Sequence, residues 1–184
     1  MSFVDSIVER CETPLVIAFV DLHGFTVQAS QLPDATVAET MQEYYVLLAG
    51  KVSDAGGHVV KFIGDGALVV FPMEQADAGI CFLLDLQSEV DSWLASKDWS
   101  CRMALRVHAA PVMAGVFGSG PNARFDVIGN AVNVAATVRT RGVALTAEAF
   151  SELSAESQKR FKKHSPPVTY IPCEAPHPHR TGRS

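Results

Sequence analysis

Two apolar runs of the sequence are each followed by an aspartate, a residue type that can bind metal ions. Asp21 lies near the end of the run that begins at Pro14, and Asp65 lies between Gly64 and Gly66 in the stretch VVKFIGDGALVVF. Carboxylates that converge in space form a hard oxygen site suited to Mg²⁺ or Mn²⁺. A pair of such ions can hold phosphate oxygens and activate a hydroxyl group. An aspartate in a turn is also common, so neither position is specific by itself.

A lysine lies inside the same stretch as Asp65. The stretch from Val59 to Phe71 consists of two apolar runs separated by a glycine-containing turn, a pattern that predicts a β-hairpin. Lys61 falls within the first strand of this hairpin. A lone lysine in a strand most often marks an exposed face or a sheet edge, so the hairpin alone does not decide between structure and function.

The elements that would position these residues alternate along the chain. The sequence predicts a buried strand over 14–22, a helix over 34–55 ended by two glycines, the hairpin, and a helix over 74–96. After these it predicts a strand pair around Pro111, a strand over 123–129, a helix over 130–141 stopped by Gly142, a strand over 143–146, a helix over 147–163 with Thr146 as N-cap, and a strand over 167–171. This mixture predicts an α+β fold, a mixed sheet with helices packed on it.

Composition excludes several classes of protein. The 184 residues suffice for one domain with a proper core, and 48% hydrophobic against 19% charged residues is typical of a globular chain. A net charge of −5 opposes a broad nucleic-acid-binding surface. No apolar stretch approaches a membrane span or a signal peptide. The four scattered cysteines indicate reduced thiols and a cytoplasmic protein.

Four motifs, taken in order, resemble the class III nucleotide cyclase catalytic domain. They are FVDLHGFT, VVKFIGDGALVVF, VHAAPVMAGVFG and RFDVIGNAVNVAA, at the spacing of that family over residues 14–155. The resemblance implies one catalytic domain over residues 1–172 with a ferredoxin-like βαββαβ core, and residues 173–184 are expected to form a disordered tail. It also implies a head-to-tail homodimer whose two active sites are shared across the interface.

The resemblance further implies a reaction and its ligands. The ribose 3′-hydroxyl of a nucleoside triphosphate attacks the α-phosphate, and pyrophosphate leaves. The implied ligands of two Mg²⁺ or Mn²⁺ ions per site are Asp21, Asp65 and the backbone carbonyl of Leu22. The implied contacts to the β- and γ-phosphates lie in the turn formed by His23, Gly24, Phe25 and Thr26.

The other subunit is expected to supply the groups that bind the base and the ribose. The family's base-reading pair falls on Lys61 and Asp126, and its ribose-positioning residue falls on Asn133. A lysine donates to a ring nitrogen and a carboxylate accepts from an exocyclic amine, which matches adenine. Guanine presents an oxygen that the carboxylate would repel. Cytosine also offers a ring acceptor beside an amine, so ATP is favoured and CTP is not excluded.

One position departs from the family. Four residues after Asn133 the family has an arginine that stabilises charge on the α-phosphate, and this chain has Thr137. In the expected helix, Arg141 would lie one turn further on, with its guanidinium leaning back toward Thr137. Arg141 is therefore expected to substitute, the alternative being a contact with the end of the helix. Arg139 should point away.

Three interpretations follow. The leading one is a metal-dependent cyclase that uses ATP. The second is a pyrimidine cyclase, acting on CTP or UTP, of a bacterial anti-phage signalling system. The third is a catalytically degenerate cyclase domain that acts as a nucleotide-binding or interaction module. Retention of both acidic residues, Asp21 and Asp65, favours an enzyme over the third interpretation.

Overall fold

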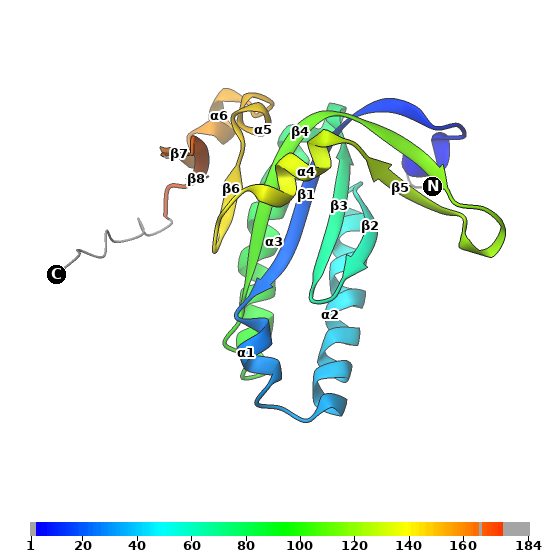
Figure 1. The fold of residues 1–184 in the computed structure, drawn as a ribbon. Helices are drawn as coiled ribbons and strands as arrows, with labels where there is room; N and C mark the ends of the chain where they lie inside the picture. Colours follow the sequence, from blue (N-terminus) through cyan, green and yellow to red (C-terminus); the bar gives the residue numbers. More distant parts are fainter. Residues whose placement is uncertain (1–2, 166, 175–184) are drawn as a thin grey trace.

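The computed structural model describes residues 3–165 and 167–174, so most of the expected tail lies outside the described residues. The first half contains β1 (Cys11–His23), α1 (Phe25–Ala29), α2 (Asp34–Asp54), β2 (His58–Ile63), β3 (Gly66–Pro72), α3 (Ala76–Ser96) and β4 (Arg102–Phe117) (Figure 1). The second half contains β5 (Arg124–Ile128), α4 (Asn130–Thr137), β6 (Val143–Leu145), α5 (Ala147–Ser151), α6 (Ala155–Gln158), β7 (Phe161–His164) and β8 (Thr169–Pro172). No helix in the described ranges has the length and apolar character needed to cross a membrane.

One mixed sheet organises the chain. Its strands run in the order β2-β3-β1-β4-β6-β8-β7, and β5 pairs with β4 outside this path. The long apolar strand β1 is central, antiparallel to both β3 and β4. The first four strands with α2 and α3 form the expected ferredoxin-like βαββαβ core, which confirms the predicted fold class.

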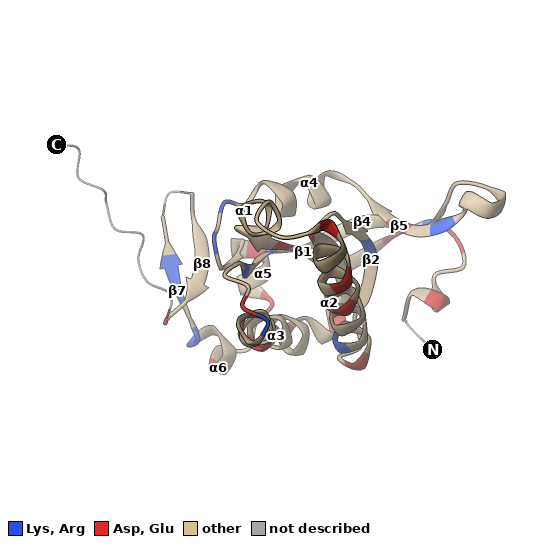
Figure 2. Cartoon of the chain, turned by 90° about the horizontal axis from the view of Figure 1, so that it is seen from below, with Lys and Arg blue, Asp and Glu red and all other residues tan. Residues whose placement is uncertain are grey.

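The two faces of the sheet bury different side chains of β1. Val16 and Val20 face a core that includes Tyr44 of α2 and Leu83 of α3. Ile17, on the opposite face, belongs to a second core that α4 covers. Figure 2 shows the same layers from below, with α4 on one side of β1 and β4 and α3 on the other. Because β1 is buried on both faces, it is a nearly continuous apolar run.

The segment around Pro111 forms one strand rather than the expected pair. β4 stays paired with β1 from Arg102 to Ala114, and Pro111 lies opposite Pro14. On its other edge β4 pairs with β6 at Leu105–Val107 and with β5 at Met113–Phe117, so Pro111 falls between these two partners. A proline is tolerated where its missing N–H is not needed by a neighbouring strand, which explains why the strand continues.

The expected helix over 147–163 is also divided. Thr146 is the N-cap of α5, as predicted, and its side chain accepts from the backbone N–H of Ala149. Ser154 then caps a new helix, α6, by accepting from the N–H of Ser157. A second cap restarts the helix in a new direction, and residues from Phe161 onward pair with β8 instead.

Candidate active site

The turn between β2 and β3 places Asp65 against the end of β1. The register of β1 and β3 pairs Val20 with Ala67. The backbone N–H of Leu22 donates a hydrogen bond to Oδ2 of Asp65 over 3.2 Å. Because Leu22 directly follows Asp21, this bond brings together the two aspartates that the sequence singles out.

The glycines on either side of Asp65 are required by this geometry. Gly64 has a φ of 61°, a backbone conformation that residues with a Cβ rarely adopt. A Cβ added at Gly66 would lie 2.6 Å from the carbonyl oxygen of Val20. The Gly-Asp-Gly sequence therefore allows the hairpin to approach β1 closely enough for Asp65 to reach Leu22.

The two carboxylates repel each other. Burial raises the pKa of Asp65 and repulsion from Asp21 adds to the rise, against hydrogen bonds from the backbone N–H groups of Asp65 and Leu22 that lower it. Burial, followed by the charges of Asp65 and Asp21, also raises the pKa of the Tyr44 hydroxyl. That buried hydroxyl has no hydrogen-bond partner within the described residues. Positive charge placed between the carboxylates would relieve the repulsion.

The donors fit Mg²⁺ or Mn²⁺ that is bound together with a phosphate ligand. Mg²⁺ commonly takes one or two carboxylates and completes its shell with water and substrate phosphates. Residues 3–165 and 167–174 contain no cluster of three or more His, Cys, Asp or Glu side chains that would form an all-protein metal site. Asp21, Asp65 and the carbonyl oxygen of Leu22 are thus an incomplete set of hard oxygen donors, which a nucleoside triphosphate would complete.

The expected phosphate-binding turn follows Asp21 directly. Gly24, with a φ of 92°, is the N-cap residue of α1, and Phe25 and Thr26 form the start of that helix. The first intrahelical bond is from the N–H of Gln28 to the carbonyl of Gly24. The N–H groups before it have no acceptor inside the helix and are free to bind an anion. The contact with phosphate stays a prediction.

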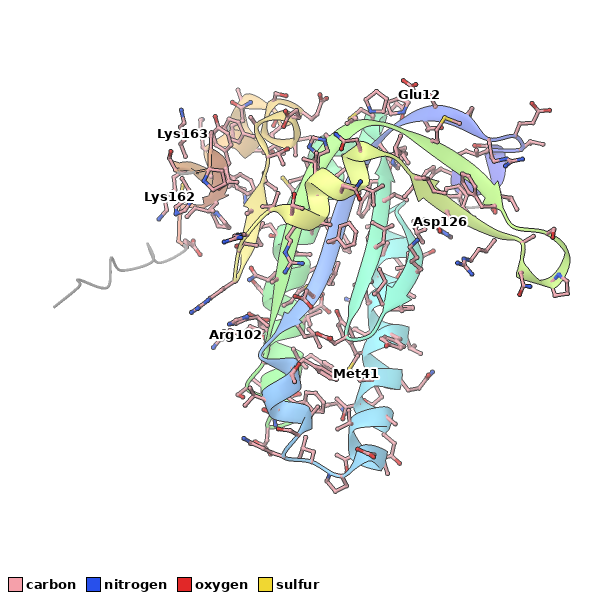
Figure 3. All side chains as sticks on the ribbon, viewed as in Figure 1. Glu12, Met41, Arg102, Asp126, Lys162 and Lys163 are labelled. Carbon is pink, nitrogen blue, oxygen red and sulfur yellow. The ribbon has the colours of Figure 1, made fainter. Side chains whose placement is uncertain are left out.

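The expected base-reading residues form an ion pair within one chain. Nζ of Lys61 lies 2.8 Å from each carboxylate oxygen of Asp126, where β5 passes beside β2 (Figure 3). Oδ1 of Asp126 also accepts from the backbone N–H of Val127 over 2.8 Å. A β-bulge between Val59 and Lys61 shifts the register of β2 at this point. The structure therefore brings the pair together, and recognition of a base stays a prediction.

The helix that carries Asn133 is shorter than the sequence predicts. α4 ends at Thr137, and Val138 already has an extended backbone. Arg141 lies in a bend beyond the helix, so the expected placement of Arg141 over Thr137 on one helical face is wrong. Val138 and Thr140 are β-branched and weak helix formers, and Thr140 accepts a hydrogen bond from the backbone two residues later. Helix geometry therefore does not support Arg141 as the substitute for the missing arginine, and that role stays a prediction.

Arg106 of β4 is a member of the site that the sequence patterns did not single out. Its Nη2 lies 3.1 Å from Oδ2 of Asp21. Asp21, Arg106 and Gly66 line a pocket of about 180 Å³. The available signal was a charged residue within an apolar strand, as at Lys61, in the stretch MALRVHAA.

Comparison with known proteins identifies relatives of the chain. Residues 8–166 match the family described as the adenylate and guanylate cyclase catalytic domain. Adenylate cyclase 2 of Rhizobium meliloti is 27% identical over 160 residues, which cover 83% of this chain and 42% of that protein. An uncharacterized protein of Mycobacterium tuberculosis is 31% identical over 127 residues, which cover 68% of this chain and 22% of that protein. The chain thus spans less than half the length of these curated relatives.

Solved structures show the same fold. A bacterial light-regulated adenylyl cyclase superposes with a TM-score of 0.79 at 26% identity, over 94% of this chain and 55% of that chain. The adenylyl cyclase CyaB from P. aeruginosa gives 0.78 at 15% identity, over 92% and 98% of the two chains. A dimeric guanylyl cyclase domain of the RhoGC fusion protein from Blastocladiella emersonii gives 0.72 at 19% identity, over 89% and 97%. With the family match over residues 8–166, the chain belongs to the class III adenylate and guanylate cyclase catalytic domain family.

Proposed function

We propose that the chain is a metal-dependent nucleotide cyclase that converts ATP into 3′,5′-cyclic AMP and pyrophosphate. The observation that carries this proposal is the hydrogen bond from Leu22 to Asp65, which holds Asp65 beside Asp21. The ribose 3′-oxygen attacks the α-phosphorus, the bond from that phosphorus to the β-bridging oxygen breaks, and the hydroxyl proton passes to solvent. Mg²⁺ or Mn²⁺, two ions per site, would supply the charge that activates the hydroxyl and neutralises the leaving pyrophosphate.

On this proposal, residues of β1, α1 and the β2–β3 turn bind the triphosphate and its cations. Asp21, Asp65 and the carbonyl of Leu22 hold the cations, and the turn from Gly24 to Thr26 binds the β- and γ-phosphates through backbone N–H groups. The support is the arrangement of these groups, because α1 starts directly after the strand that carries Asp21. Because Asp21, Leu22 and the turn belong to one continuous segment, and the hydrogen bond from Leu22 holds Asp65 beside it, the position of the α-phosphate would be fixed relative to both the cations and the other phosphates.

The ion pair of Lys61 and Asp126 supports ATP as substrate. The two side chains already lie side by side, 2.8 Å apart, so a donor and an acceptor are presented together. Adenine can accept from Lys61 at N1 and donate its 6-amino group to Asp126. Cytosine also has a ring acceptor next to an exocyclic amine. The ion pair therefore also favours the second candidate, a cyclase for a pyrimidine nucleotide in a bacterial anti-phage system.

We further propose a homodimer with shared active sites. Two exposed apolar residues lie on one face of the β4–β5 hairpin, Met113 at 41% and Ile128 at 52% exposed. Met113 and Ile128 are paired across the two strands, so their side chains are neighbours. Grouped exposed apolar residues are typical of an interface. In the dimer, Lys61, Asp126 and Asn133 of one subunit would serve the metal site of the other.

A cytoplasmic location is proposed from the substrate and the cysteines. Cys11, Cys81, Cys101 and Cys173 are free thiols. Free thiols are usual where the compartment is reducing, and nucleoside triphosphates are the proposed substrates.

The function is tested by incubating the protein with Mn²⁺ and, separately, ATP, GTP, CTP and UTP. We expect cyclic AMP and pyrophosphate from ATP, because Lys61 and Asp126 match its base edge, and we expect mass spectrometry to find little product from GTP. Product from CTP or UTP alone would refute ATP as substrate and favour the pyrimidine cyclase. No cyclic product from any nucleotide would refute the enzyme and leave the nucleotide-binding or interaction module.

The threonine at position 137, where the family has an arginine, favours such a degenerate domain. It leads to a second prediction. Thr137→Arg should raise kcat by on the order of tenfold or more with little change in KM, because an arginine there would stabilise charge that develops on the α-phosphate. Thr137 is exposed at the end of α4, so the longer side chain has room. Steady-state kinetics of Thr137→Gln, which adds length without charge, provide the control, and equal acceleration by both would contradict the explanation.

Arg141→Ala tests whether Arg141, which lies in the bend after α4, takes the role of the arginine that is missing at position 137. If it does, kcat should fall by on the order of 10²-fold at nearly constant KM, and Thr137→Arg should restore part of the loss. Arg139→Ala is the matched control and should have little effect. A silent Arg141→Ala beside a faster Thr137→Arg would remove Arg141 from the site.

A further inference from the structure

Arg106 contacts the proposed metal site through one carboxylate oxygen. In the register of β4 and β1, Arg106 lies opposite Phe19 and Ala104 lies opposite Asp21. Arg106 therefore reaches Asp21 diagonally across the two strands, on the face from which both side chains project. Within the described ranges this ion pair, at 3.1 Å, is the single hydrogen bond that the Arg106 side chain makes.

The guanidinium of Arg106 is placed where positive charge is needed. Asp21 and Asp65 repel each other. Within residues 3–165 and 167–174, Arg106 is the one cationic side chain that forms an ion pair with either of these two carboxylates. A cation bound by Asp21 would lie close to this guanidinium, so the cation and Arg106 would repel each other and compete for the same carboxylate. Arg106 thus balances charge in the free protein and opposes a divalent ion that arrives alone.

Arg106 also has the freedom and the chemistry for a second partner. Its side chain is 22% exposed and makes a single hydrogen bond within the described residues, and it lines the pocket of about 180 Å³ beside Asp21. A guanidinium has five N–H donors in a planar fork that matches phosphate oxygens. Most of these donors are unused in the contact with Asp21.

We propose that Arg106 is a substrate-positioning residue that changes partner, from Asp21 in the free protein to the triphosphate when divalent cations bind Asp21. The inference rests on the proposed cyclase function and adds a residue and an order of events to it. Arg106 makes binding of free metal unfavourable, and it makes binding of metal together with nucleotide favourable, because the phosphates offer the guanidinium a new anionic partner.

The test compares Arg106→Gln with wild type in two binding measurements on the full chain. Affinity for Mn²⁺ without nucleotide is measured by the electron paramagnetic resonance of free Mn²⁺. Affinity for 3′-deoxyATP, which lacks the attacking hydroxyl, is measured calorimetrically at saturating Mn²⁺. We expect Arg106→Gln to bind Mn²⁺ about tenfold more tightly, since the competing charge is gone, and 3′-deoxyATP about tenfold more weakly, since a charged phosphate contact is lost. If CTP is the substrate, 3′-deoxyCTP replaces the analogue.

Arg160 offers a matched control away from the site. It pairs with Asp85 at 2.6 Å and its side chain is 40% exposed, so Arg160→Gln makes the same change in net charge at a surface ion pair that has no place in the proposed site. Both affinities of Arg160→Gln should stay within about twofold of wild type, because exposed charges are screened. Arg106→Lys keeps the charge without the fork. It should keep the wild-type Mn²⁺ affinity and lose part of the analogue affinity.

Opposite changes in the two affinities of Arg106→Gln are the signature of the change of partner. A purely structural role would lower both affinities together, and that result, or no change in either, would overturn the proposal. Thermal melts establish that each variant is folded, and if Arg106→Gln does not fold, Arg106→Lys decides: equal loss of both affinities overturns the proposal. Wild-type protein that binds neither Mn²⁺ nor the analogue would overturn the cyclase function, and this inference with it.

Discussion

Replacing Asp21 or Asp65 by alanine should lower the rate of cyclic nucleotide formation by on the order of 10³-fold or more. On the proposed function, each change removes a carboxylate that would hold the cations, and the charge that these cations would neutralise on the α-phosphate and pyrophosphate is then unbalanced. The assay is product formation at saturating Mn²⁺ and nucleotide, followed by mass spectrometry. Retention of most of the activity by either variant would refute the assignment of these residues.

The same variants should remain folded. Asp65→Ala loses the hydrogen bond from Leu22, worth about 1 kcal/mol, but it also removes the repulsion between Asp65 and Asp21. We therefore expect thermal melts close to that of wild type. Asp85→Ala is a suitable control for activity, because Asp85 forms a surface ion pair with Arg160 and has no place in the proposed site.

Mixing two inactive variants should restore activity if the sites are shared between subunits. In a heterodimer of Asp65→Ala with Asn133→Ala, one site carries both defects and the other carries none. Random exchange between equal amounts makes half of the dimers mixed, so we expect about a quarter of the wild-type activity. The measurement is activity before and after incubation of the mixture, with subunit exchange followed by energy transfer between labelled chains.

A second mixture provides the control for shared sites. Asp21→Ala and Asp65→Ala affect the same half of the site, so each site of their heterodimer lacks one metal ligand and the mixture should remain inactive. Recovery in this control, or no recovery in the first mixture despite demonstrated exchange, would contradict the shared site.

The parts of the fold that the sequence predicted correctly are those with local signals. The continuous apolar run of β1 marks a strand buried on both faces. The Gly-Asp-Gly turn marks the hairpin, because Gly64 and Gly66 are required by its backbone geometry. These signals, in the order of the family's motifs, are enough for the βαββαβ core and for the two aspartates that the structure brings together; metal binding by them stays a prediction.

The errors concern interactions between distant segments and competing local preferences. Pro111 looks like a break until β1, β5 and β6 are seen to pair with β4 in ways that do not need its N–H. Gly142 marked a helix end, but the β-branched residues before it had already ended α4 at Thr137. Arg106 and Asp21 are 85 residues apart in the sequence, and only the register of two strands reveals their contact.

The ion pair between Lys61 and Asp126 has a consequence for how substrate preference can evolve. Asp126 is buried, with 8% of its surface exposed, and Lys61 is its only cationic partner in the described residues. Neutralising Lys61 alone would leave a buried carboxylate unpaired, and reversing its charge would place two carboxylates together, each at a cost in stability. On the proposal that this pair reads the base, descendants that read a different base must change both positions, so we expect the two positions to covary in an alignment of relatives and ancestors with one change to be rare.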